Sequence, residues 1–90
     1  MSRPSEQPRL ELVAPCWRMR GPSGQVLSCA IYRTGAGLEV RAGYANDLLH
    51  SQGVFNEEAG FVWAERYRQA ILGQGGFEEL PVSGNANFTG

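Results

Sequence analysis

The chain has 90 residues, with eight arginines, no lysine, nine acidic residues and a net charge of −1. This length allows one domain at most, and proteins that hold polyanions usually show a clearer positive excess. No apolar run approaches the roughly 20 residues needed to span a bilayer, and the N-terminus lacks the apolar stretch of a secretory signal. We therefore expect a cytoplasmic protein with no membrane partner.

Both ends of the chain have compositions typical of flexible tails. Residues 1–11 are rich in proline, serine and charge, and residues 81–90 carry almost no apolar side chains. Neither segment can bury enough surface to offset the entropy of ordering it. The sequence predicts flexible tails at 1–11 and 81–90 and one domain over 12–80. A core of this size is marginal, so a homodimer is a reasonable expectation.

Residues 14–44 alternate with period two, which predicts a three-stranded antiparallel meander. In the first turn, "GPSGQ", Pro22 presets a type I turn and Gly24 takes the left-handed position, so that Gly21 pairs with Gln25. The second turn, "RTGAG", precedes the strand "LEVRAGY". In this register Trp17 lies opposite Cys29, and one apolar face carries Trp17, Met19, Leu27, Cys29, Ile31, Leu38, Val40, Ala42 and Tyr44.

After the meander the pattern changes. Residues 45–56 are interpreted as a connection that holds one helical turn at Asp47–His50. Asn56 is a good N-cap for an amphipathic helix of about 17 residues, which "GQGG" ends. Phe77 and Leu80 are expected to fold back over one edge of the core. Packing the helix on the sheet gives an α+β fold, β-β-β-α in two layers. The core face of the helix is predicted to carry Ala59, Trp63, Ala64, Tyr67, Ala70 and Ile71.

The cysteines and the single histidine indicate neither a metal site nor a catalytic centre. The hairpin register sends Cys16 and Cys29 to opposite faces of the sheet, which argues against a disulfide. A structural zinc site needs four ligands, and the chain has only two cysteines and one histidine, His50. The carboxylates are scattered, and no nucleophile is placed near them. We therefore expect a non-enzymatic protein without cofactor or small-molecule substrate.

The face of the sheet that the helix leaves uncovered is the candidate site. Residues 14–46 hold four arginines and one glutamate, whereas residues 47–90 hold six acids and two arginines. This dipolar distribution suits self-association, with small residues receiving a partner and arginines forming a polar rim. The alternative is nucleic-acid binding, since guanidinium groups beside an aromatic ring bind phosphates and bases. A third reading is a polar face that serves only solubility. The face would carry Arg18, Arg20, Ser28, Ala30, Tyr32 and Arg41.

Two resemblances accompany this interpretation. The expected arrangement is similar at the level of fold to the AP2-type plant DNA-binding domain, which reads DNA with arginine and tryptophan side chains of a three-stranded sheet. None of that family's sequence motifs is matched. The string from "CWRMRGPSG" through "GLEVRAGY" to "GGFEEL" resembles short uncharacterised proteins of high-GC Gram-negative bacteria, a group to which no activity is attached. We therefore expect a protein-interaction module, with nucleic-acid binding as the alternative.

Overall fold

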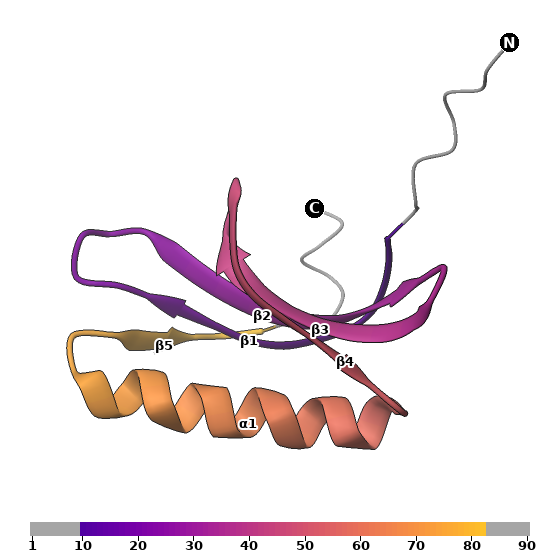
Figure 1. Cartoon of the computed structure of the whole chain (residues 1–90). Coiled ribbons are helices and arrows are strands. Elements are labelled where there is room, and N and C mark those ends of the chain that lie inside the picture. The colour runs from indigo at the N-terminus through magenta and orange to yellow at the C-terminus, as the bar shows by residue number, and fades with distance from the viewer. Residues whose placement is uncertain (1–9, 83–90) are drawn as a thin grey trace, which may run out of the picture.

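The fold is a curved antiparallel sheet with one helix packed against a single face (Figure 1). The computed structural model describes residues 10–82, and most of the tails expected at 1–11 and 81–90 lie outside this range. The α+β class is confirmed, but the sheet has five strands rather than three. In chain order the elements are β1 (Glu11–Arg20), β2 (Val26–Thr34), β3 (Gly37–Tyr44), β4 (Asp47–Val54), α1 (Glu57–Gln74) and β5 (Glu78–Leu80), and the strand order in the sheet is β4-β3-β2-β1-β5.

The segment expected to be a connection forms the fourth strand. β4 pairs antiparallel with β3 along its length, so the helical turn expected at Asp47–His50 is wrong. Leu49 is an extra residue between Leu48 and His50, which pair with adjacent residues of β3. Such a bulge interrupts the alternation of side chains that identifies a strand. Because the two leucines are adjacent, the segment lacks the alternation of apolar and polar residues by which a strand is predicted.

The first hairpin has the predicted register. The Gly21 N–H donates a hydrogen bond of 2.8 Å to the Gln25 carbonyl, and Gly24 has a φ of 91°, in the left-handed region. Trp17 lies opposite Cys29, as expected. β3 continues the same alternation on the far side of β2. The predicted division of the three strands into an apolar face and an open face is therefore confirmed, except at the bulges.

β5 adds to the other edge of the sheet. It pairs antiparallel with the end of β1, with Arg20 opposite Glu78 and Arg18 opposite Leu80. Phe77 is half-buried against the core. The "FEEL" segment thus folds back as expected, but it does so as a short strand, and Leu80 lies opposite Arg18 rather than among the residues packed on the core.

β1 contains two bulges that bend it. Its pairing with β2 shifts by one residue at Val13 and again at Cys16, on either side of Pro15. A bulge sets two residues opposite one and increases the local bend and twist of the strand. In Figure 1 the N-terminal end of β1 and the turn between β3 and β4 both rise on the side away from α1. The open face of the sheet is therefore concave.

The helix begins where its capping residue predicts. The Asn56 side chain accepts a hydrogen bond of 2.8 Å from the Ala59 N–H, and Glu57 and Glu58 follow in the first turn. The helix runs for 18 residues, and Gly75 beyond its end has a φ of 83°. No helix in the described part of the chain combines the length and the apolar character needed to cross a membrane.

Trp17 is the aromatic anchor between the two layers. Its side chain is 5% exposed, and its indole N–H donates a 2.8 Å hydrogen bond to the Ala64 carbonyl of α1. Trp63 and Tyr67, which were expected on the core face, are only half-buried there, and Ala70 is exposed. The buried apolar core consists of Trp17, Met19, Leu27, Cys29, Ile31, Val40, Ala42, Ala64 and Ile71.

Candidate functional site

The concave face of the sheet holds a hollow of about 540 Å³, referred to below as the hollow. Ser28 and Gly43 pair across β2 and β3 and line it, together with Ala30. Their short side chains leave the middle of the face low. The turn between β3 and β4, which also lines the hollow, rises beside it (Figure 1). The hollow therefore has a shallow floor and one raised wall.

Ala30 shows how far the sheet curves. Cys29 and Ile31, its neighbours along β2, face the core, so the Ala30 side chain points to the side away from α1. It is nevertheless only 7% exposed. On a flat open sheet an alanine without a covering layer would be well exposed. The cross-strand partners of Ala30, Pro15 on β1 and Arg41 on β3, flank it on the same face of the curved sheet.

Exposed leucines surround the hollow. Leu10 and Leu48 line it and are 45% and 48% exposed. Leu12 lies opposite Tyr32, on the same face, and is equally open to solvent. Large apolar side chains that cluster around a concavity mark an interaction surface more often than isolated ones do.

One positive and one negative side chain lie at the hollow. Arg41 on β3 and Asp47 at the start of β4 both line it. Within residues 10–82, the ion pairs involve neither of them. The surface thus presents an uncompensated cation and an uncompensated anion at separate positions.

The structure brings together some, but not all, of the residues expected on this face. Arg18 and Arg20 lie on β1 next to β5 and do not line the hollow. A guanidinium nitrogen of Arg20 is 3.9 Å from a carboxylate oxygen of Glu78. Arg18 faces Ser28 across β1 and β2 and so shares the open face, but it lies outside the lining of the hollow. The four residues of the predicted set that line the hollow are Ser28, Ala30, Tyr32 and Arg41.

Sequence reasoning missed Leu10, Asp47 and Leu48. Leu10 was placed in a tail, and the other two were assigned to a connection. Tyr44 pairs with Asp47, so only two residues, Ala45 and Asn46, form the turn. Neither residue has a positive φ, so this turn lacks the backbone geometry that makes two-residue hairpin loops recognisable from glycine and asparagine in a sequence.

The two cysteines lie on the same face of the sheet, which corrects the expectation that they diverge. Cys16 is the extra residue of the bulge beside Trp17, which lies opposite Cys29, and all three side chains pack into or against the core. Hydrogen bonding toward Cys29 lowers the pKa of Cys16, whereas hydrogen bonding toward Cys16 together with burial raises the pKa of Cys29.

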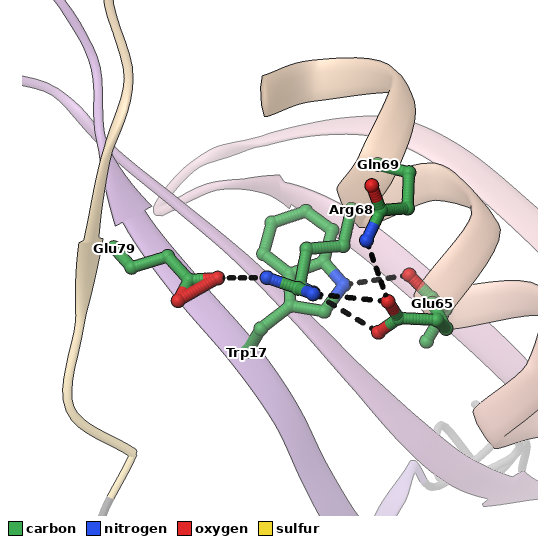
Figure 2. A network of polar contacts seen from close by, with 6 residues as sticks. Trp17, Glu65, Arg68, Gln69 and Glu79 are labelled. Atoms are coloured by element: carbon green, nitrogen blue, oxygen red, sulfur yellow. Dashed lines mark hydrogen bonds and ion pairs between the residues drawn. The ribbon is translucent and has the colours of Figure 1, made fainter. Parts of the chain in front are cut away.

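A polar network ties α1 to β5 (Figure 2). The Arg68 guanidinium donates hydrogen bonds to Glu65 at 2.9 and 3.0 Å and also bonds to Glu79 of β5. Gln69 donates a further bond of 2.9 Å to Glu65. The hydrogen bonds from Arg68 and Gln69 lower the pKa of Glu65 to about 2. These bonds link the side chains of Glu65, Arg68, Gln69 and Glu79 with one another, so this polar network has a structural role.

His50 belongs to an aromatic cluster rather than to an ionic one. Its ring centre lies 5.1 Å from that of Tyr67 and 6.2 Å from that of Trp63. Across residues 10–82, no three histidine, cysteine or acidic side chains gather in a group that could hold a metal ion.

Comparison of the chain with protein-family models, with curated proteins and with solved structures gave no match. The five-stranded sheet also differs from the three-stranded sheet of the AP2-type domain. Function is therefore inferred from the described surface.

Proposed function

We propose that this chain is a small non-enzymatic protein-interaction module that self-associates through the concave face of its sheet. The observation that carries the proposal is the hollow, where a low floor, exposed leucines and one unpaired charge of each sign occur together. The three features are those of an interface core with a polar rim.

Apolar burial favours a second copy on this face. Leu10, Leu12 and Leu48 each keep nearly half of their surface in contact with water in the monomer. Covering apolar surface contributes roughly 25 cal/mol for each Å² removed from water. A domain of this size has a small core of its own, so burial between copies adds a useful share of its stability.

The charges favour a two-fold arrangement. In such an interface the same surface occurs on both sides, so residue i of one copy meets residue j of the other and the reverse contact follows. Arg41 of one copy can then approach Asp47 of the second copy, and the pair forms twice. The raised turn between β3 and β4 of each copy would enter the hollow of the other.

Nucleic-acid binding through the sheet arginines has less support. Arg20 lies near Glu78, and Glu39 shares the open face with Arg41. A phosphate backbone would meet these acids together with the arginines. A nucleic-acid complex would weaken steeply as salt increases, so titration of a labelled oligonucleotide at two salt concentrations separates this alternative from self-association.

Sedimentation equilibrium over a range of protein concentrations tests the proposal. We expect a concentration-dependent dimer for the wild type, and a monomer for Arg41→Asp and for Asp47→Arg, because each change sets like charges opposite one another. The double variant Arg41→Asp/Asp47→Arg should dimerise again. A wild-type chain that stays monomeric, or a double variant that is as monomeric as the single ones, would overturn this arrangement.

A second pair of variants tests the apolar contribution. Leu48→Glu places a charge at the hollow and should abolish the dimer. Val62→Glu makes the same kind of change at an equally exposed position on α1, which does not line the hollow. It should therefore leave the dimer intact, and circular dichroism confirms that both variants are folded.

A further inference from the structure

We propose that Cys16 and Cys29 form a reversible intramolecular disulfide, in which Cys16 reacts first with a small-molecule disulfide such as oxidised glutathione and Cys29 closes the bond. This dithiol is distinct from the hollow, because the two cysteines lie on the side of the sheet that α1 covers. The inference does not depend on self-association.

The strand geometry brings the two cysteines close together. A regular register would place neighbours of Trp17 on the opposite face from Cys29. The bulge instead leaves Cys16 as the extra residue beside Trp17, whose partner on β2 is Cys29. Residues directly opposite each other on antiparallel strands have Cα atoms about 4.5–5.5 Å apart, and disulfides span Cα separations of about 4.4–6.8 Å. Cys16 is thus one residue away from a strand position that meets this requirement toward Cys29.

Both cysteine side chains lie against the same core cluster, on neighbouring strands of the sheet. Forming the disulfide requires the two sulfurs to approach each other between β1 and β2.

Access to the two sulfurs is unequal. Cys29 is 2% exposed and lies within the core. Cys16 is half-buried and lines a second hollow of about 440 Å³, between β1, α1 and β5. Arg68, Glu65 and Glu79 line the same space. A reagent in solution therefore reaches Cys16 before it reaches Cys29.

Cys16 also ionises more readily than Cys29. Hydrogen bonding toward Cys29 lowers the pKa of Cys16, and hydrogen bonding toward Cys16, with burial, raises the pKa of Cys29. Thiolates rather than thiols attack disulfides, so the accessible sulfur is also the one that ionises more readily. Exposure and ionisation thus both assign the first step to Cys16.

The reaction balances as two successive exchanges. The Cys16 thiolate attacks one sulfur of glutathione disulfide, which forms a protein–glutathione disulfide and releases one glutathione thiolate. That thiolate accepts the proton of the Cys29 thiol. The Cys29 sulfur then attacks the Cys16 sulfur and displaces the second glutathione thiolate, which takes up the proton that Cys16 released on ionising. Two protein thiols are oxidised and one glutathione disulfide is reduced to two thiols.

Incubation of the reduced full chain with oxidised glutathione tests this order of events. Intact-mass spectrometry after alkylation of the remaining thiols should show wild-type chains that have lost both free thiols and retain no glutathione. Peptide mapping should find Cys16 linked to Cys29. In short pulses of an alkylating reagent, Cys16 should be modified at least about tenfold faster than Cys29.

Two alanine variants separate the roles, and circular dichroism establishes that each is folded. Cys29→Ala should retain one glutathione at Cys16, because no second thiol can displace it. Cys16→Ala should stay unmodified when folded and should react once urea exposes Cys29. The proposal is overturned if wild-type chains accumulate stable glutathione adducts, link only to one another, or remain fully reduced. Peptide mapping and alkylation rates use the wild type, so they decide the question even if a variant does not fold.

Discussion

Replacing Gly60 by alanine is expected to lose stability, although alanine is the better helix former. Gly60 is one of the buried residues of α1, on the side that packs against the sheet. A Cβ at this position would be 2.8 Å from Cδ1 of Ile31 and 3.3 Å from Cγ2 of Val40. Both neighbours are 0% exposed, so neither has free space to move into. The helix must therefore shift away from the sheet, or the two side chains must leave their favoured rotamers.

A second glycine of the same helix gives the matched control. Nothing lies within 4 Å of a Cβ built on Gly73, so Gly73→Ala should gain up to about 1 kcal/mol from helix propensity alone. At Gly60 the same gain is opposed by an overpacking cost of about 1–3 kcal/mol. Gly60→Ala should therefore be less stable than Gly73→Ala by about 1–3 kcal/mol.

Removing the clashing atom should relieve the strain. Ile31→Val deletes Cδ1 and by itself should cost about 0.5–1.5 kcal/mol. In the double variant with Gly60→Ala, the total cost should be smaller than the sum of the two single costs, because one change makes room for the other. Urea unfolding followed by tryptophan fluorescence measures the free energies of unfolding of the wild type, the single variants and the double variant. If Gly60→Ala stabilises the chain as much as Gly73→Ala does, the close approach of helix and sheet is wrong.

The remaining predictions concern Trp17 and the polar network around Arg68. Trp17→Phe removes a buried indole and its hydrogen bond and should lower the free energy of unfolding by about 1–3 kcal/mol, whereas Trp63→Phe at a half-exposed position should cost less, as urea titration can show. In the folded chain the pKa of Glu65 is about 2, below its value of about 4.3 in an unfolded chain. Ionised Glu65 therefore stabilises the fold fully above about pH 5, and this stabilisation is lost as the pH falls towards 2. Glu65→Gln should therefore show a shallower fall of Tm than the wild type between about pH 5 and 2, and parallel curves would contradict the role of Arg68.

Local backbone chemistry made the turns and the helix boundary predictable. Pro22 and Gly24 specify one loop length, and this length determines the register of the first hairpin. Asn56 marks the helix start because its side chain replaces a backbone hydrogen-bond acceptor. Each of these signals acts over a few residues, so it can be read without knowledge of the rest of the fold.

The bulges could not be predicted in the same way. Val13, Cys16 and Leu49 do not differ in residue type from regular strand residues, and their irregular pairing depends on how neighbouring strands curve together. The position of Pro15 inside a strand was a partial signal, because proline in sheets is confined to edges and bulges. Missing the bulge at Cys16 led to the wrong placement of the cysteines, and missing the one at Leu49 hid a whole strand.

The candidate surface was predictable in its alternation but not in its shape. Period two correctly assigns Ser28, Ala30 and Arg41 to the face that the helix leaves open. It cannot show which residues of this face line the hollow, because alternation contains no information about how far the sheet bends.

The irregular first half of β1 also determines how strands can be added to this sheet. Residues 11–17 pair only with β2 in the described part of the chain, and β5 covers no more than the last three residues of β1. A strand added beside residues 11–17 would find no N–H at Pro15 and two interruptions of the ladder. The outer edge of β4 contains no proline. The outer edge of β4 is therefore a better template for a further strand than the irregular half of β1.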